Sequence, residues 1–291
     1  MFSLVTVLTL SAAVCAQDAP RPPEDTTPPP ATPRVMKPVT RENIQEAISR
    51  GVETILATQQ PDGSFLLSPQ LETTYPVGMT ALGVLALQHA RPHLTGDVSA
   101  RAAEGVRKGL ARLSQMSFDG KTYSAGFAIC AFFKEHPRTY SREIGQFAGF
   151  LVSAQHKRKN LPIYGQWGYL LYDAKVHGTG ASIERIRFWA DNSNNQIAIL
   201  GLYQASRAGF QVPRKTWERA REAYLTSQNP DGGWGYTAQS RPESYANMTI
   251  AGTISLYICE EMLNATQHAV CRPPPASPGV EKGMKWIVDN F

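Results

Sequence analysis

Hydrophobic positions along this chain recur with helical spacing from about residue 40 to the C-terminus. In some segments the apolar residues occupy one face, which predicts an amphipathic helix with one side in water. In others nearly every residue is apolar or small, which is typical of a helix that is covered on all sides. Amphipathic helices are predicted at residues 40–59, 97–115, 141–155, 213–228 and 279–291, and wholly apolar helices at 78–90, 124–133, 194–209 and 246–263.

The two kinds of helix alternate, and this alternation predicts the architecture. An inner ring of apolar helices enclosed by an outer ring of amphipathic helices leaves every hydrophobic face covered. We therefore expect an all-α fold with two concentric layers. The inner helices are expected to begin near Val77, Ser124, Ser193 and Asn247.

Several outer helices end in a glutamine, and a turn that contains glycine or an aromatic residue follows. Such turns begin at Gln59, Gln155 and Gln228, and a looser copy follows Gln115. The last of them lies in the stretch Ser-Gln-Asn-Pro-Asp-Gly-Gly-Trp-Gly-Tyr, residues 227–236. A turn that recurs after successive outer helices indicates a repeat architecture.

These turns resemble the QW repeats of squalene and oxidosqualene cyclases and the related turns of protein prenyltransferase β subunits, where Gln-x-x-x-Gly-x-Trp follows an outer helix. The segments 191–209 and 244–259 also look like those of secreted bacterial prenyltransferase/squalene-oxidase-repeat proteins. The resemblance implies that residues 39–291 fold as an α/α toroid. The structural repeat motif would comprise Gln59, Gln155, Trp167, Gln228, Asp231, Gly233 and Trp234, with Phe65 replacing tryptophan in the first turn.

Within that motif, Asp231 is expected to form the turn rather than act as an acid, because Asp favours turns. The indoles of Trp167 and Trp234 are expected to pack over the glutamines of their turns. Complete toroids of this superfamily close with more helix pairs than this chain supplies, and no inner helix follows the last outer one. The toroid is therefore expected to be incomplete at its C-terminus, either as a fragment or as an arc that needs a protein partner.

The catalytic residues of the enzymes in this superfamily are missing. Squalene cyclases protonate an alkene with an Asp-rich DxDD acid, whereas the nearest segment here, 191–194, holds one carboxylate among amides and a hydroxyl. A single carboxylate is a weak acid for so poor a base. Prenyltransferases bind zinc through Asp, Cys and His, and their Asp-x-Cys pairing is absent. We therefore predict no cofactor and no metal, and the sequence names no catalytic residue.

Polar residues gather at the starts of the predicted inner helices, which in a toroid open at one end of the central cavity. Helix N-termini present free N–H groups and positive potential, which suit a polar or anionic ligand. Helix capping is the competing interpretation, because Asp, Asn and Ser are preferred caps. The candidate ligand-binding residues are Tyr75, Asp191, Asn192, Asn194, Asn195, Gln196, Tyr245, Asn247 and Thr249.

The distribution of charge bears on the class of partner, and the positions of the cysteines bear on disulfide bonding. The net charge of +5 is mild and its basic residues are spread along the chain, which disfavours a nucleic-acid partner. Cys130 lies in an apolar run and is expected to be a buried free thiol. Cys259 and Cys271 are candidates for a disulfide, because a helix end and the Pro-rich loop after it can fold back on each other.

The first residues predict export. Residues 1–16 have an apolar core and end in Val-Cys-Ala, which is typical of a signal peptide cleaved after Ala16. A lipoprotein with its lipid on Cys15 is the less favoured alternative. Residues 17–38 are rich in proline and charge and predict a disordered linker. The protein is thus expected in the periplasm or outside the cell, without a transmembrane span.

The sequence leaves three functions open. The first is a binding or scaffold module at the cell envelope, which the missing catalytic residues favour. The second is a terpenoid cyclase- or transferase-like enzyme acting on an isoprenoid in the central cavity. The third is a toroidal carbohydrate lyase or hydrolase, which needs paired carboxylates, and Asp191 with Asp231 or Asp173 is the only hint of such a pair.

Overall fold

The computed structural model describes residues 39–66, 75–170, 189–237, 243–264 and 277–291. The predicted signal peptide (1–16) and linker (17–38) lie outside these residues, as do Asp173 and Cys271. Within the described ranges the fold is helical, and the β-type pairings there are isolated bridges. The predicted all-α class is confirmed.

Helices that are buried nearly all round form the inner layer. Thr80, Ser124 and Thr249 are buried in them beside apolar neighbours, because these helices have no side in water. Their starts lie within two residues of those predicted. The inner helices are α4 (Pro76–Ala90), α6 (Thr122–Glu135), α10 (Asn192–Arg207) and α12 (Ala246–Asn264), and the 3₁₀ helix η2 (Arg91–His93) follows α4.

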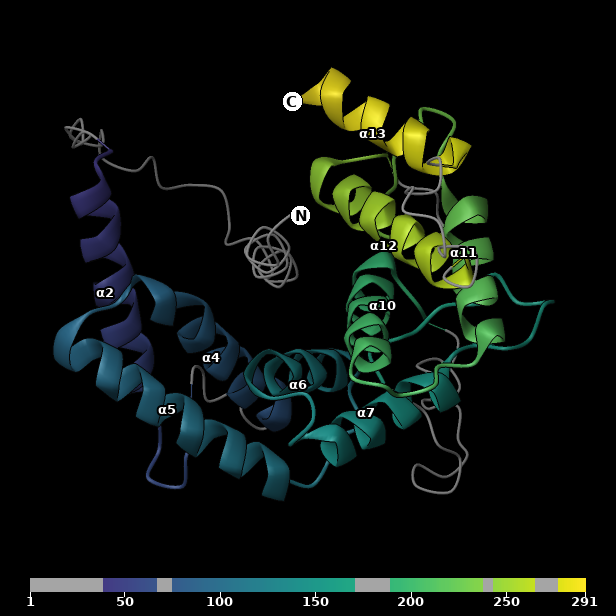
Figure 1. Ribbon diagram of the computed structural model, residues 1–291. Helices are drawn as coiled ribbons and strands as arrows, with labels where there is room; N and C mark the ends of the chain where they lie inside the picture. The colour runs from purple at the N-terminus through teal and green to yellow at the C-terminus, as the bar shows by residue number, and fades with distance from the viewer. Residues whose placement is uncertain (1–38, 67–74, 171–188, 238–242, 265–276) are drawn as a thin grey trace, which may run out of the picture.

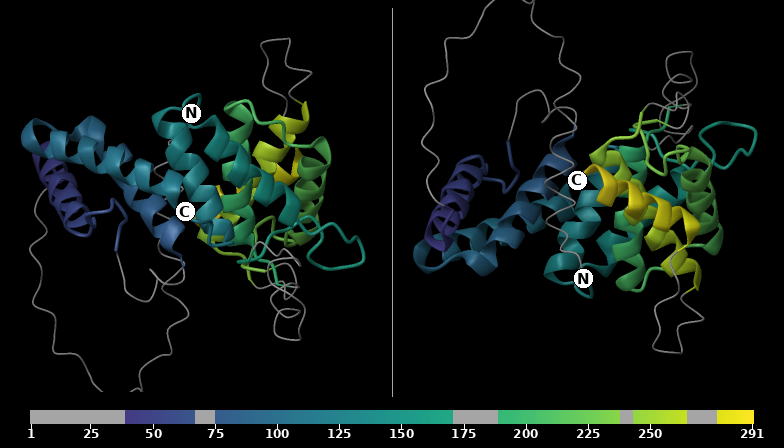
Figure 2. Two further views of the ribbon diagram at one scale, coloured as in Figure 1. Left: turned by 90° about the horizontal axis from the view of Figure 1, so that it is seen from below. Right: turned by 90° about the horizontal axis from the view of Figure 1, so that it is seen from above.

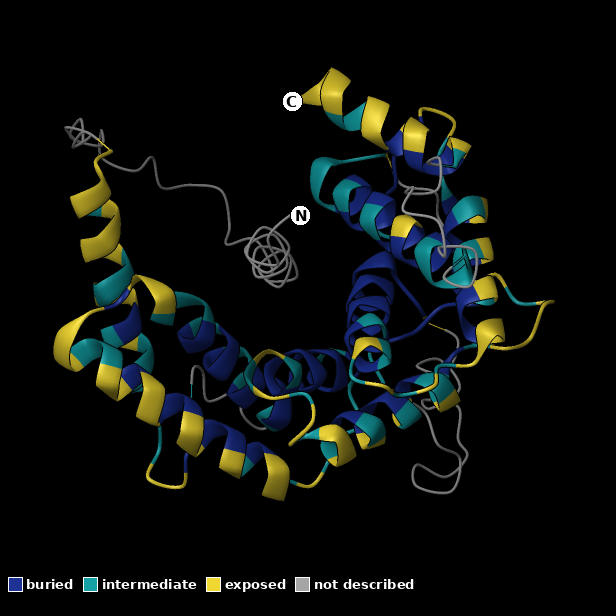
Figure 3. Cartoon of the chain, in the orientation of Figure 1, coloured by how far each residue is buried: buried dark blue, intermediate teal, exposed yellow. Residues whose placement is uncertain are grey.

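The outer helices bury one stripe each and leave the rest exposed (Figure 3). In α13, for example, only Gly279, Val280 and Gly283 are buried. None of the helices in the described part of the chain is long and apolar enough to cross a bilayer. The outer helices are α2 (Arg41–Ala57), α5 (Gly96–Gln115), α7 (Ser141–Ala154), α11 (Arg214–Ser227) and α13 (Pro278–Asn290).

The helices follow an open arc (Figure 1). The inner helices line its concave side in the order α4, α6, α10, α12, and each packs on the next. Helices α5, α7 and α11 lie on the convex side, while α2 and α13 stand at the two ends and remain well apart in the perpendicular views (Figure 2). The buried and half-buried layers alternate as predicted, and the described helices form an open arc, so the incomplete toroid expected from the sequence stays a prediction.

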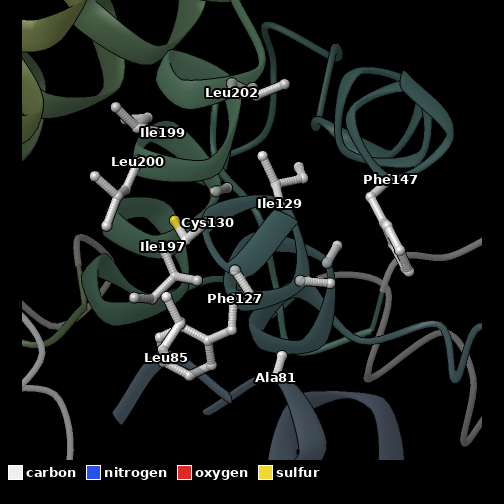
Figure 4. Packing of buried hydrophobic residues seen from close by; sticks show 14 of the residues in the cluster. Ala81, Leu85, Phe127, Ile129, Cys130, Phe147, Ile197, Ile199, Leu200 and Leu202 are labelled. Carbon is white, nitrogen blue, oxygen red and sulfur yellow. The ribbon is translucent and has the colours of Figure 1, made fainter. Parts of the chain in front are cut away.

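The inner helices α6 and α10 approach each other closely at two glycines. A Cβ on Gly126 would lie 2.4 Å from Cγ2 of Ile197, and one on Gly201 would lie 3.0 Å from Cα of Gly126. Figure 4 shows the side chains that surround this crossing: Phe127 and Leu85 lie beside Ile197, and Ile129 lies on the side of Phe147. Close approach of two backbones at glycine fixes the direction in which α10 runs.

Both cysteines in the described residues are buried free thiols, Cys130 in α6 and Cys259 in α12. Burial raises the pKa of the Cys130 thiol to about 12 and raises that of Cys259 as well. Cys259 is fully buried, and its predicted pairing with Cys271 stays a prediction. The proposed partner, Cys271, lies outside the described residues.

Candidate functional site

Three turns join successive outer helices through the same hydrogen bonds, and we call them the clasp turns: residues 59–65, 155–167 and 228–234. In the last, the side-chain amide of Gln228 donates from Nε2 to the carbonyl oxygen of Gly232 in its own turn, at 2.8 Å. The same nitrogen donates to the carbonyl oxygen of Gly279 in α13, also at 2.8 Å. One amide thus ties the end of α11 to the first turn of α13.

The two other clasp turns repeat this geometry, with one bond inside the turn and one to a following outer helix. The bonds run from Gln59 to the carbonyls of Gly63 (3.1 Å) and Gly105 (2.9 Å), and from Gln155 to those of Gly165 (3.0 Å) and Thr216 (3.0 Å). Because the acceptors are backbone oxygens, the clasp depends on helix position rather than on the type of the partner residue.

A glycine in the left-handed region lies inside each clasp turn. Gly165 has φ +82° and Gly232 has φ +92°. A Cβ on Gly165 would lie 2.1 Å from the carbonyl oxygen of Arg219, and one on Gly232 would lie 2.8 Å from that of Lys282. Any other residue would therefore be strained and would also push the following outer helix away.

The repeat motif expected from sequence named Gly233, whereas the left-handed residue is its neighbour Gly232. Gly233 is required for a different reason, since a Cβ there would lie 2.5 Å from Cβ of Ser244 and 2.8 Å from Oγ1 of Thr249.

The aromatic residue of each clasp turn is buried between helices. Trp234 donates from Nε1 to the carbonyl oxygen of Tyr224 at 3.0 Å, and its ring lies against Gly252 of α12 and Gly283 of α13. The packing of Trp234 on its own glutamine, which the sequence suggested, stays a prediction.

In the other two clasp turns, the carbonyl four residues before the glutamine also accepts a hydrogen bond from a side chain. Trp167 donates from Nε1 to the carbonyl oxygen of Leu151 at 2.7 Å, four residues before its glutamine, as Tyr224 is before Gln228. Phe65 has no such N–H. At the equivalent position the carbonyl of Ile55 instead accepts a bond from the Thr58 hydroxyl at 2.7 Å. The exchange of tryptophan for phenylalanine therefore leaves no carbonyl unpaired.

Two candidate ligand residues, Asn195 and Thr249, belong to this framework. Oδ1 of Asn195 accepts the backbone N–H of Trp167 at 2.7 Å, and Oγ1 of Thr249 accepts that of Trp234 at 3.1 Å. Thr80 does the same for Phe65 at 3.3 Å. These side chains anchor a clasp turn to the first turns of an inner helix, so they are not available to a ligand.

Asp231 also serves the turn. Its Oδ1 accepts the backbone N–H of Gly233 at 3.0 Å and the hydroxyl of Ser244 at 2.8 Å, and its Oδ2 accepts Nε1 of Trp286 at 3.0 Å. Asp191 lies in a different setting, at the start of α10, so the structure gives no support to the two as a catalytic pair.

Asp191 is the N-cap of α10 and is fully buried, with 0% of its surface exposed. Its Oδ1 accepts the Ser193 hydroxyl at 2.5 Å and the backbone N–H of Asn194 at 2.9 Å. Its Oδ2 accepts Nδ2 of Asn194 at 2.8 Å. Burial raises the pKa of the Asp191 carboxyl, and these hydrogen bonds act in the opposite direction.

Asn192 secures the chain that follows the third clasp turn. Its backbone N–H donates to the carbonyl of Tyr236 and its Nδ2 to that of Gly235, each at 2.9 Å. The remaining candidates, Gln196, Asn247 and Tyr75, stand at the starts of α10, α12 and α4. The ring of Tyr75 lies 5.5 Å from the ammonium nitrogen of Lys121.

Four half-buried tyrosines gather beside the buried cap, and we call Tyr123, Tyr169, Tyr236 and Tyr245 the tyrosine cluster. The rings of Tyr123 and Tyr169 stack with centroids 6.3 Å apart. The hydroxyls of Tyr169 and Tyr236 are hydrogen-bonded to each other, and that of Tyr236 lies 3.5 Å from Oγ of Ser193. The sequence analysis named Tyr245, but it missed Tyr169 and Tyr236.

The phenols of Tyr169 and Tyr245 stay protonated at neutral pH. Burial, then the hydrogen bond to Tyr236 and the nearby Asp191, raise the pKa of Tyr169. Burial and the neighbouring Tyr236 and Asp191 raise that of Tyr245 to about 12. Groups with such pKa values act as hydrogen-bond donors and acceptors at neutral pH and cannot act as bases.

A second carboxyl lies at the neighbouring inner-helix start. Asp119 accepts the hydroxyl of Ser124 at 2.7 Å and the backbone N–H of Lys121 at 3.1 Å, and burial raises its pKa. Across the described residues, no group of three or more His, Cys, Asp or Glu side chains is arranged to hold a metal ion.

No protein-family model matches this chain, and a search of curated proteins finds no relative.

Proposed function

We propose that this protein is an exported binding module that holds a small polar ligand at the tyrosine cluster, on an α/α framework related to the squalene-cyclase-like repeat proteins. One observation carries the proposal. The hydroxyls of Tyr169, Tyr236 and Ser193, from three distant segments, converge beside the fully buried carboxylate of Asp191. Convergence of a few polar groups at partly accessible aromatic side chains is typical of ligand sites.

The chemistry of these groups favours binding over catalysis. The carboxylate of Asp191 is occupied by three hydrogen bonds from its own helix turn, and it is buried away from any substrate. The raised pKa values of Tyr169 and Tyr245 make both phenols poor acids and keep them protonated at neutral pH, so neither is available as a base. Hydrogen bonding and stacking are what such groups supply.

Mass spectrometry of small molecules that co-purify with the full chain tests the proposal. We expect a discrete ligand with the wild-type protein and a reduced amount with Tyr236→Phe, which removes one hydroxyl and keeps the ring. Tyr140→Phe is the matched control, because Tyr140 packs on Phe132 at the other end of α6. A ligand retained equally by Tyr236→Phe, or no ligand with any of these proteins, would contradict the proposal.

The scaffold alternative has its own support at the end of the arc. Met284, Val288 and Phe291 of the α13 segment are 46%, 73% and 78% exposed, which is high for apolar side chains on one helix. A covering protein partner would remove this surface from water. If residues 39–291 form a monodisperse monomer that melts cooperatively, this second role fails.

A further inference from the structure

We propose that the ligand of the tyrosine cluster is a neutral carbohydrate, bound through its hydroxyls and through the apolar face of one sugar ring. The inference rests on the proposed binding function and names the class of its ligand. It follows from three properties of the cluster: uncharged hydroxyl groups, stacked aromatic rings, and little net charge among the described residues around them.

The hydroxyl groups form a short relay that ends in the protein interior. Ser193 donates its hydroxyl to Asp191, and its Oγ also lies 3.5 Å from the hydroxyl of Tyr236. The hydroxyls of Tyr236 and Tyr169 share a hydrogen bond, and each phenol can donate once and also accept. Groups that both donate and accept match the hydroxyls of a sugar, which do the same.

One further polar atom lies at this carboxylate. The side-chain oxygen of Asn194 is a buried acceptor that receives no hydrogen bond from the described residues, while Nδ2 of the same amide is bound to Asp191. Buried acceptors are normally paired. The start of α10 therefore holds one buried acceptor that the described residues leave unsatisfied, directly beneath the tyrosine cluster.

The aromatic rings supply the second half of sugar recognition. Tyr123 and Tyr169 stack at an interplanar angle of 21°, and Tyr123 also packs on Phe127 with centroids 5.7 Å apart. All four tyrosines of the cluster are half-buried, so part of each stays accessible. Tyrosine combines an apolar ring with a polar tip, which suits the C–H face and the hydroxyl edge of a sugar ring.

The charges argue against the alternatives. A diphosphate-bearing isoprenoid needs several cations around its phosphates. In the described part of the chain, Lys121 is a cation near this cluster. It lies over the ring of Tyr75 and beside the carboxylate of Asp119. A cationic ligand would need an exposed carboxylate, whereas Asp191 is buried and already accepts three hydrogen bonds.

Calorimetric titration of the full chain tests the inference, with maltohexaose, cellohexaose, chitohexaose and farnesyl diphosphate as probes at up to millimolar concentration. We expect at least one oligosaccharide to bind, and Tyr169→Phe and Tyr236→Phe to weaken it roughly tenfold each, as loss of one hydrogen bond does. Tyr140→Phe should bind like the wild type. Circular dichroism of the three variants verifies that each is folded.

The outcomes separate the two proposals. Farnesyl diphosphate binding that depends on Tyr169 and Tyr236, with no oligosaccharide binding, overturns the carbohydrate inference and leaves the binding site in place. Oligosaccharide binding that neither tyrosine variant weakens overturns the inference and the site together. Binding of none of the four probes overturns the carbohydrate inference, and the ligand found by mass spectrometry then decides whether the site itself stands.

Discussion

The third clasp turn, 228–234, and the start of α10, 191–196, look alike as sequence. Each is short, polar and centred on one aspartate, and each could be a site. In the structure Asp231 is exposed and bonds to its own turn and to Trp286, whereas Asp191 is fully buried and caps a helix. The clasp turn is held by backbone geometry, while the start of α10 is a buried support under accessible tyrosines.

The difference shows that the setting of a polar residue decides its use. The exposed Asp231 stabilises the turn that carries it and ties Ser244 and Trp286 to that turn. The buried Asp191 orients Ser193 and, through it, the tyrosine cluster at which we propose that a ligand binds. Substitutions in the two regions should therefore separate stability from binding.

The largest effect is expected from Gly232→Ala in the clasp turn. It places a Cβ on a residue with φ +92° and 2.8 Å from the carbonyl oxygen of Lys282. We expect a loss of about 3 kcal/mol in the free energy of unfolding, measured with urea. Gly149→Ala in α7, where a Cβ meets nothing within 4 Å, should change stability by less than about 1 kcal/mol. Equal losses of stability in Gly232→Ala and Gly149→Ala would show that the close approach at Gly232 does not hold the clasp turn.

The second-largest loss of stability is expected from Gln228→Ala. It removes both amide hydrogen bonds and leaves the carbonyls of Gly232 and Gly279 without them, at a cost of about 2 kcal/mol. Gln115 ends α5 but is exposed and carries no such bonds in the described residues. Gln115→Ala should therefore stay within about 0.5 kcal/mol of the wild type. A Gln115→Ala effect as large as that of Gln228→Ala would show that the glutamines act only through helix propensity.

In the start of α10, Asp191→Ala should lower the free energy of unfolding by about 1 to 2 kcal/mol through loss of the N-cap. It should also weaken binding at the tyrosine cluster, because Ser193 loses its acceptor. Gln228→Ala should leave the binding of a co-purifying ligand unchanged in the folded protein. Titration of both variants against wild type checks this, and a loss of binding in Gln228→Ala alone would reverse the assignment.

The smallest effect is a difference in pH dependence. Burial raises the pKa of Asp191, so its contribution to stability is present below the ordinary value of 3.8 and is lost as pH rises through the folded pKa. For Asp231 burial acts to raise the pKa, but the hydrogen bonds from Gly233, Ser244 and Trp286 together lower it. Its contribution is present above 3.8 and is lost as pH falls through the folded pKa.

Urea unfolding between about pH 3 and 6 measures this difference. Asp191→Asn should remove a decline in stability with rising pH, and Asp231→Asn should remove a decline with falling pH. If both variants shift the profile in the same direction, the two aspartates do not differ in the way that their surroundings indicate.

Helix positions were well predicted, because periodicity reports which faces are covered. The start expected near Ser193 is found at Asn192, and that near Asn247 at Ala246. The sequence also identified the glutamines that begin the clasp turns. It could not identify their hydrogen-bond partners, because Gly105, Thr216 and Gly279 accept through backbone oxygens and need no particular side chain.

Only part of the candidate site could be predicted from the sequence, because the rest depends on contacts between distant segments. Asp191 and its amide neighbours stand out as a polar run before an apolar helix, so they drew attention. Tyr169 and Tyr236 follow two clasp turns and look like ordinary aromatic residues in loops. Only folding brings their hydroxyls together, across 67 positions of sequence.

By itself the sequence determined that the fold is all-α, which helices are covered on all sides, and where turns repeat, since these properties depend on local periodicity and on residues such as Gln228 that recur at the ends of outer helices. Tertiary structure alone decided that Asn195 and Thr249 hold clasp turns and that tyrosines gather over Asp191. Those outcomes depend on which distant segments pack together, and local pattern does not encode that.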